Sequence, residues 1–458
     1  MTTRRVSWKN IVLSAAALTS LTLFVMESPL GMDAPTRVVG VVLVTAATLW
    51  VTEVVPLFVT SFVILFLNLV WLRPVLEQAG HSVDGGVFLT PFFSDVVLLF
   101  LGGFVLSSAL HKFQLDDRIA RAIISRTGRT VPRFLFGVMA VTAGLSMWLS
   151  NTATAATMLA LCLPVVGSLP PGDAYRKAIV LGIAFAANLG GLGTPIGSPP
   201  NAIALDYMRQ AGLAPRFWMW LAIGLPGVVV MLVLSWAVLL FCFRGQQDEI
   251  GVSSEQPTNG INRRSLVVIG GALTTVVGWI TTEWHGYSAG TVALIPLLLF
   301  FGLKLLNVND LRALSWDVLL VMGGGACLGV AIDVSGMDEW IIGNLPLQSS
   351  SVFTVMVVFG TLAVVMSSVM SNTATANLLL PIAMGLNVSC VTPVMIGVAF
   401  ACSLAMPLPI STPPNAMAFG SGELTTVDML KPGLFIAVVG SALAFTTGYW
   451  WWDIVGLF

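Results

Sequence analysis

Long apolar runs, interrupted at a few places by small polar clusters, form the pattern along this chain. Most runs approach the roughly 20 residues that an α-helix needs to cross a bilayer, so they predict an all-α polytopic membrane protein. We expect spanning helices over 10–27, 38–52, 55–72, 94–111, 217–243, 265–284, 288–306, 316–333 and 430–452. Two further spans, over 176–210 and 391–421, are expected as helices broken in the middle.

Two apolar pairs, over 134–168 and 352–386, each contain a polar motif at their centre and are expected as re-entrant hairpins. With the N-terminus in the cytoplasm, this arrangement places about 17 of the 21 Lys and Arg residues on the cytoplasmic side, as the positive-inside rule favours. The prediction is eleven transmembrane helices plus two hairpins that enter from opposite faces, with the C-terminus outside. Such opposed hairpins are typical of an inverted repeat.

The polar clusters occur twice in the same order. The sequence SNTAT stands at 150–154 and again at 371–375, and the later clusters are GSPPN at 197–201 and STPPN at 411–415. The two SNTAT copies are 221 residues apart. Asp95, which precedes Gly102-Gly103, likewise matches Asp317 before the run of glycines at 323–325, at an offset of 222. Repeated matches at nearly one offset indicate an internal structural repeat.

The repeat divides the chain into a first half, 1–243, and a second half, 265–458. The segment between them, 244–264, is the most polar stretch of the sequence. We therefore interpret it as a cytoplasmic linker.

Composition narrows the class of function. Of the 458 residues, 56% are hydrophobic and 9% are charged, whereas soluble domains carry about 25% charged residues. The partner implied is a lipid bilayer, and the net charge of −1 gives no reason to expect a nucleic acid. An intramembrane enzyme would need a Ser/His pair, two membrane aspartates or an HExxH motif, and the segments around the motifs contain none of these, so we do not expect an enzyme. A channel would need a continuous pore, and opposed hairpins favour alternating access instead.

No charged residue lies between Arg133 and Asp173 or between Glu339 and Glu423, and both SNTAT motifs fall in these intervals. Ser, Thr and Asn are strong helix N-caps, and Pro is favoured at the first helical position. The four clusters therefore predict four helix N-termini, each with free backbone N–H groups and roughly half a positive charge. Such ends bind anions.

The helices that stop at each motif leave carbonyl groups with partial negative charge. With Ser and Asn side-chain oxygens, these carbonyls would form an all-oxygen site that suits a small hard cation, for which Na⁺ is the natural candidate. Two such sites, one in each repeat, would place positive charge beside a bound anion. Because an unpaired buried dianion is costly, we expect cation and anion binding to be coupled.

At these residues the sequence resembles the divalent anion/sodium symporters, which carry dicarboxylates, citrate or sulfate. The resemblance rests on both SNTAT motifs, on the stretch from 400 to 428 that contains PLPISTPPNAMAFGSGELTTVDM, and on LLFLGGFVLSSAL at 98–110. It implies a homodimer that works as an elevator, in which a scaffold domain (about 10–111, 217–243 and 265–333) holds a moving transport domain. That transport domain would consist of the hairpins, the broken helices and the last helix.

The resemblance also implies site residues. One Na⁺ site would use Ser146, Ser150, Asn151 and the backbone near Gly197, and the other would use Ser367, Ser371, Asn372 and the backbone near Ser411. Substrate carboxylates would meet Asn151, Thr152, Ser198, Pro199, Asn372, Thr373, Thr412 and Pro413. Ser367 stands where the family leads us to expect Thr, a change that keeps the hydroxyl group.

These observations lead us to expect a sodium-coupled transporter of C4-dicarboxylates such as succinate, malate or fumarate, in a bacterial inner membrane. Two alternatives with the same fold stay open. One is an exchanger that swaps one dicarboxylate for another, and the other is a sodium-coupled citrate or sulfate carrier.

Overall fold

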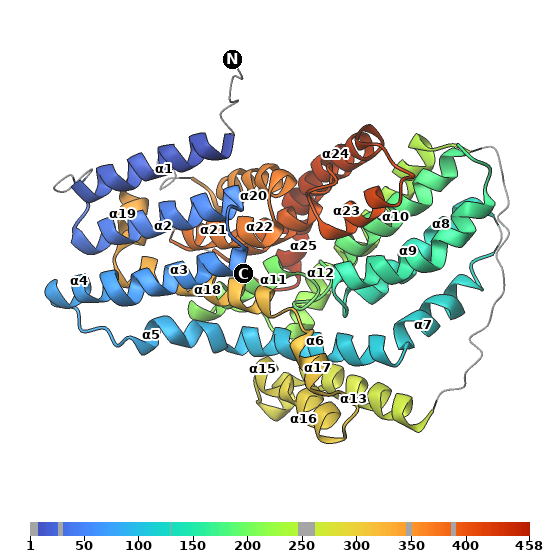
Figure 1. Ribbon diagram of the computed structural model, residues 1–458, viewed down its shortest axis with the longest axis horizontal. Coiled ribbons are helices and arrows are strands. Elements are labelled where there is room, and N and C mark those ends of the chain that lie inside the picture. The colour runs from blue at the N-terminus through green and yellow to red at the C-terminus, as the bar shows by residue number, and fades with distance from the viewer. Residues whose placement is uncertain (1–7, 26–30, 129, 246–261, 345–349, 386–390) are drawn as a thin grey trace, which may run out of the picture.

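The computed structural model describes residues 8–25, 31–128, 130–245, 262–344, 350–385 and 391–458, which fold almost entirely into helices (Figure 1). In this described part, nine helical segments are long and apolar enough to cross a membrane. They are Ala34–Thr52, Leu57–Gln78, Gly86–Lys112, Asn151–Ser168, Phe217–Cys242, Arg263–Ile280, Trp316–Val334, Val352–Val369 and Thr426–Ile454. The predicted class, an all-α polytopic membrane protein, agrees with this architecture.

The nine segments differ from the eleven expected spans in an informative way. They include one arm of each expected hairpin, and they include neither the two broken helices nor the spans expected over 10–27 and 288–306. A length criterion finds a hairpin arm because the arm is a continuous helix, and it misses a broken helix because each half is too short to span alone. The number of crossings and the re-entrant path of the hairpins therefore stay predictions.

Two series of helices follow one another in the same order. The first is α6 (Asp95–Lys112), α7 (Leu115–Ile124), α8 (Val131–Ser146), α9 (Asn151–Ser168), α10 (Ala174–Gly190), α11 (Pro199–Gln210) and α12 (Phe217–Cys242). The second is α18 (Trp316–Val334), α19 (Met337–Asn344), α20 (Val352–Val369), α21 (Asn372–Met384), α22 (Thr392–Leu404), α23 (Pro413–Gly420) and α24 (Thr426–Leu443). This parallel order is what an internal repeat requires.

The other helices flank these two series. They are α1 (Trp8–Val25), α2 (Ala34–Thr52), α3 (Leu57–Leu67), η2 (Asn68–Leu72), α4 (Arg73–Gln78), α5 (Gly86–Leu89), η3 (Thr90–Phe93), α13 (Arg263–Ile280), α14 (Thr282–His285), α15 (Ala289–Val292), α16 (Leu294–Gly302), α17 (Val308–Arg312), η4 (Ala444–Gly448) and α25 (Tyr449–Ile454). Of the expected linker at 244–264, residues 246–261 lie outside the described part of the chain.

The two series interlock. Within each series, the first hairpin arm packs along the first half of the broken helix, α8 on α10 and α20 on α22. The second arm also packs against the other series, so that α9 contacts α23 and α21 contacts α11. Figure 1 shows α8, α9, α10, α23 and α24 gathered at one end of the molecule. The break in each broken helix is thus surrounded by elements of both repeats.

The first halves of the broken helices are the most enclosed elements. Every residue of α10 from Ala178 to Gly190 is buried, and so is every residue of α22. A helix that is apolar all round belongs in the interior of a bundle. Behind them, α12 packs on α8 and α10, and α24 packs on α20 and α22. α12 thus packs beside the hairpin and the broken helix of the first repeat. The division into scaffold and transport domains, in which the sequence places 217–243 in the scaffold, stays a prediction.

Candidate functional site

The four polar clusters all stand at helix N-termini. Ser150, Ser198, Ser371 and Thr412 are the N-cap residues of α9, α11, α21 and α23. Ser150 accepts a hydrogen bond from the backbone N–H of Ala153 (3.1 Å), and Thr412 accepts one from that of Asn415 (3.3 Å). The side chains of Ser198 and Ser371 make no such bond within their helices. All four positions agree with the cap expected from sequence, and two of the four hydroxyls also act as the cap.

In the first repeat, oxygen atoms from three segments converge. The Ser146 hydroxyl at the end of α8 lies 2.7 Å from the carbonyl oxygen of Ala187 and 2.6 Å from the Asn151 side-chain oxygen. That hydroxyl has one proton and therefore cannot donate fully to both. The Asn151 amide also lies 3.1 Å from the Gly197 carbonyl oxygen and 3.2 Å from that of Ala187. We call Ser146, Asn151, Ala187 and Gly197 the first oxygen cluster.

The orientation of the Asn151 amide decides what this cluster can do. With Oδ1 facing inward, the cluster presents four oxygen atoms, as a site for a hard cation requires. With Nδ2 facing inward, the amide donates to the Ser146 hydroxyl and to the Ala187 and Gly197 carbonyls. In one orientation the Asn151 amide therefore supplies hydrogen-bond donors to the other oxygens of the cluster. In the other orientation it adds a fourth oxygen that could bind a cation. Gly197 is suited to this place because a Cβ there would lie 2.6 Å from the Gly191 carbonyl oxygen.

The second repeat places its equivalent oxygens in a less paired state. The Asn372 Oδ1 atom is buried and has no hydrogen-bond partner in the described structure, and the buried Ser367 hydroxyl has only the Cys402 thiol beside it, a weak hydrogen-bonding group. A buried polar atom without a partner is rare in folded proteins, and two oxygens in this state fit a cation. Ser411 instead donates to the Ser368 carbonyl (3.0 Å) and accepts from the Leu408 N–H (3.2 Å). The structure thus connects Ser411 to the end of hairpin arm α20, one residue after Ser367.

The residues predicted to meet the substrate differ in exposure. Thr152 and Pro413 are exposed, Pro199 and Thr373 are half-buried, and Ser198 and Thr412 are buried. Ser198 lies 3.3 Å from the hydroxyl of Ser403 on α22. Hydrogen-bond partners of these residues in the described part are hydroxyl, amide and backbone groups. No basic side chain is among them, as the charge-free sequence intervals predict.

Three asparagines that are not among the predicted site residues lie at the breaks. Asn201 donates to the carbonyls of Gly191 (2.8 Å) and Thr194 (2.9 Å), which stabilises the loop between α10 and α11. Asn415 donates in the same way to Met406 (3.0 Å) and Leu408 (3.1 Å). The repeated PPN sequence was a signal for these two residues. Nothing in the sequence pointed to Asn188, which donates to the side-chain oxygen of Asn415 (3.1 Å).

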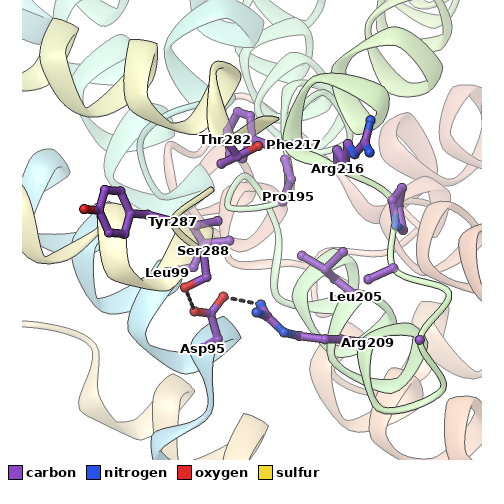
Figure 2. A pocket seen from close by; sticks show the side chains of 14 residues that line it. Asp95, Leu99, Pro195, Leu205, Arg209, Arg216, Phe217, Thr282, Tyr287 and Ser288 are labelled. Carbon is purple, nitrogen blue, oxygen red and sulfur yellow. Dashed lines mark hydrogen bonds and ion pairs between the residues drawn. The ribbon is translucent and has the colours of Figure 1, made fainter. Parts of the chain in front are cut away.

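A separate cavity of about 320 Å³ lies where α6, α11, α12 and α15 end or begin, and Pro195 of the first break forms part of its wall. Figure 2 shows Asp95 and Arg209 pointing toward one another in this cavity, where they form an ion pair. Asp95 also accepts from the Ser288 hydroxyl and from the Gly290 N–H (3.1 Å). Asp95 therefore makes hydrogen bonds between segments that are far apart in the sequence.

Two further ion pairs connect the repeats at the opposite ends of the broken helices. Arg176 at the start of α10 contacts both carboxylate oxygens of Glu423 (2.5 and 2.8 Å), and Lys177 contacts those of Asp428 (2.9 and 3.0 Å). Bidentate Arg–carboxylate pairs combine strength with geometric specificity. The hydrogen bond from Arg176 lowers the pKa of Glu423 below its ordinary value.

Comparisons with known proteins agree with this architecture. The citrate transporter (CitMHS) family model matches residues 47–393. The sodium-dependent dicarboxylate transporter SdcS of Staphylococcus saprophyticus is 31% identical over 430 residues, covering 85% of this chain and 81% of its own length. SdcS of Staphylococcus aureus strain USA300 is 30% identical over 465 residues, covering 92% and 88%.

Two other relatives extend the comparison. An uncharacterised transporter of Schizosaccharomyces pombe is 31% identical over 432 residues, or 89% of this chain, and the chain spans about half of that relative's length (49%). Among solved structures, the YdaH transporter of Alcanivorax borkumensis matches with a TM-score of 0.53 at 11% identity, covering 81% of this chain and 88% of that one. At that identity the likeness concerns the fold.

The family model covers most of the chain, including the SNTAT motif of each repeat and the first break. The predicted resemblance to carriers of dicarboxylates and citrate is confirmed by these matches. The chain belongs to the citrate transporter family of membrane transporters.

Proposed function

We propose that this protein is a sodium-coupled transporter of C4-dicarboxylates such as succinate, malate and fumarate. The observation that carries the proposal is the arrangement at the two breaks, where oxygen clusters stand beside the N-termini of α9, α11, α21 and α23. The relatives named sodium-dependent dicarboxylate transporters support a dicarboxylate as the substrate and Na⁺ as the coupling ion.

Two Na⁺ ions would bind, one in each repeat. The first would bind between Ser146, Asn151 and the carbonyls of Ala187 and Gly197, and Ser150 would be a further ligand. The second would bind at Ser367 and Asn372, with Ser371 and the backbone near Ser411. The unpaired Asn372 Oδ1 and the weakly paired Ser367 hydroxyl support this assignment because a cation would satisfy both.

The dicarboxylate would bind between the two repeats. One carboxylate would meet Asn151, Thr152, Ser198 and Pro199, and the other would meet Asn372, Thr373, Thr412 and Pro413. Helix N-termini supply N–H donors and positive partial charge, and the bound Na⁺ ions supply the remaining compensation. Coupling follows because without the cations the anion would be buried without sufficient opposite charge.

Movement of this site across the bilayer would occur by an elevator mechanism in a homodimer. The transport domain would contain α8–α12 and α20–α25, because these helices pack around the two breaks, and α12 is added to it on its contacts with α8 and α10. The scaffold would contain the remaining helices. The N-terminus would be cytoplasmic and the C-terminus outside, in a bacterial inner membrane.

Citrate is the second candidate substrate, because the family model that matches is described as a citrate transporter. The test is uptake of labelled succinate into proteoliposomes, with and without a Na⁺ gradient and with and without internal dicarboxylate. Succinate uptake that needs the Na⁺ gradient supports symport, and uptake that needs internal dicarboxylate indicates exchange. Uptake of labelled citrate but not of labelled succinate would indicate that citrate is the substrate. Uptake of neither compound would refute the proposed function.

A further inference from the structure

The first oxygen cluster of one repeat is connected to the substrate-facing loop of the other repeat through a pair of buried amides. Asn188 and Asn415 are 2% and 0% exposed, and the Nδ2 of Asn188 donates to the Oδ1 of Asn415 at 3.1 Å. Asn188 directly follows Ala187, whose carbonyl is part of the first oxygen cluster. One turn of helix therefore carries both a proposed cation ligand and the donor that reaches the second repeat.

On the far side, Asn415 organises the second break. Its Nδ2 donates to the carbonyls of Met406 and Leu408, and its backbone N–H donates to the Thr412 hydroxyl. The loop that presents Thr412 is therefore built around this one amide. With Asn188 donating to its Oδ1, every polar group of the Asn415 side-chain amide is paired. Asn188 therefore holds Asn415 in one orientation, and Asn415 in turn holds the loop.

Only the first repeat supplies such an asparagine. At the offset of 214 residues that relates Asn201 to Asn415, the position that matches Asn188 is Cys402. The Oδ1 of Asn201, which corresponds to the atom that Asn188 contacts, is buried and has no partner in the described structure. The two breaks are otherwise alike. The amide pair therefore connects α10 of the first repeat to the break of the second repeat, and α22 has no equivalent asparagine to connect it to the break of the first.

We propose that Asn188 is a positioning residue that transmits Na⁺ occupancy of the first oxygen cluster to the substrate-facing loop of the second repeat. A cation that fixes the Ala187 carbonyl also fixes the last turn of α10, and with it the direction of the Asn188 amide. The loop around Asn415 then holds its substrate contacts in place before the dicarboxylate arrives. This inference rests on the proposed function, because it assumes a Na⁺ site and a dicarboxylate site.

The test separates cation binding from its effect on substrate. Binding of labelled succinate to the purified full-length protein is measured in Na⁺ and in K⁺, and the ratio of the two affinities gives the enhancement by Na⁺. Thermal stabilisation by Na⁺ alone is measured in parallel. The variants are Asn188→Ala and Asn188→Leu, the second of which keeps a branched side chain without hydrogen-bonding groups, and Asn68→Ala is the matched control. Asn68 is a buried amide that donates to Cys327, away from both breaks.

In both Asn188 variants we expect the enhancement by Na⁺ to fall about tenfold, since a buried acceptor on Asn415 loses its donor. The thermal shift caused by Na⁺ alone should stay within about twofold of wild type, because the oxygen cluster is intact. Asn68→Ala should behave as wild type in both measurements.

Three results would overturn the inference. The first is a wild-type enhancement in both Asn188 variants. The second is a parallel loss of the Na⁺ thermal shift, which would make Asn188 part of the cation site itself. The third is an equal loss in Asn68→Ala, which would show a general effect of removing a buried amide. Failure of the proposed function is distinct, because it would show as wild-type protein that binds no succinate in either salt.

Discussion

Gly197→Ala tests the geometry of the first oxygen cluster most directly. A Cβ at this position would lie 2.6 Å from the Gly191 carbonyl oxygen and 3.1 Å from the carbon atoms next to it. These atoms are backbone, so no side chain can rotate away. The loop must open by about 0.8 Å to restore an ordinary contact of 3.4 Å. Such overpacking costs about 1–3 kcal/mol of stability.

The larger expected effect is on transport. The opening displaces the Gly197 carbonyl from the Asn151 amide, and a misplacement of roughly 1 Å at a reacting or binding centre can cost about 100-fold. We expect Gly197→Ala to raise the Na⁺ concentration for half-maximal succinate uptake by at least about tenfold. The assay is initial uptake into proteoliposomes over a Na⁺ series, with the melting temperature of the purified protein measured alongside.

Gly144→Ala provides the matched control. Gly144 lies on α8 in the same hairpin, and a Cβ there would meet nothing within 4 Å. Alanine in a helix is favoured over glycine by about 1 kcal/mol, so this variant should melt at a slightly higher temperature with unchanged Na⁺ dependence. Wild-type Na⁺ dependence in Gly197→Ala would refute the assigned role of the Gly197 carbonyl.

Three further outcomes follow from the site and its surroundings. Asn151→Ala or Asn372→Ala should each abolish Na⁺-dependent uptake while the variant elutes from size-exclusion chromatography as the wild type does; transport at the wild-type rate would contradict the assignment. Asp95→Asn removes the charge of an ion pair with α11 and should lower the free energy of unfolding by about 2 kcal/mol, a loss that denaturant titration would detect. Because the folded pKa of Glu423 lies below its ordinary value of 4.5, its pair with Arg176 contributes stability above that pH and loses it as pH falls through the lower folded pKa. Glu423→Gln should therefore flatten the acid side of a melting-temperature profile, and an unchanged profile would refute the contribution.

Most of the architecture could be predicted because polar interruptions in apolar runs are strong signals. The N-caps at Ser150, Ser371, Ser198 and Thr412 follow from local preferences alone, and the structure has a helix N-terminus at each. The ends of the helices were less predictable. α10 stops at Gly190, several residues before the expected break, because the loop is stabilised by Asn201 rather than by the prolines that follow it.

The interactions between the repeats could not be predicted from one sequence. Asn188 lies near the end of the apolar run of α10 that begins at Ala178, and nothing in the sequence distinguishes it from any other buried polar residue. Its role depends on α10 and α23 packing side by side, which is a tertiary contact. The domain to which α12 belongs also cannot be predicted from one sequence, since a long apolar helix packs equally well on either domain and only its tertiary neighbours distinguish them.

The exchange of contacts between α9 and α23, and between α21 and α11, has a consequence for how the protein is made. Polar helix ends in the first half reach their partners only after the second half has been inserted, because those partners are encoded more than 200 residues later. Until then, the Asn188 amide and the Ser198 hydroxyl would stand in the membrane without their partners Asn415 and Ser403. A chain interrupted at the linker would keep that defect permanently, so truncated products should be poor candidates for stable accumulation and good targets for membrane proteases.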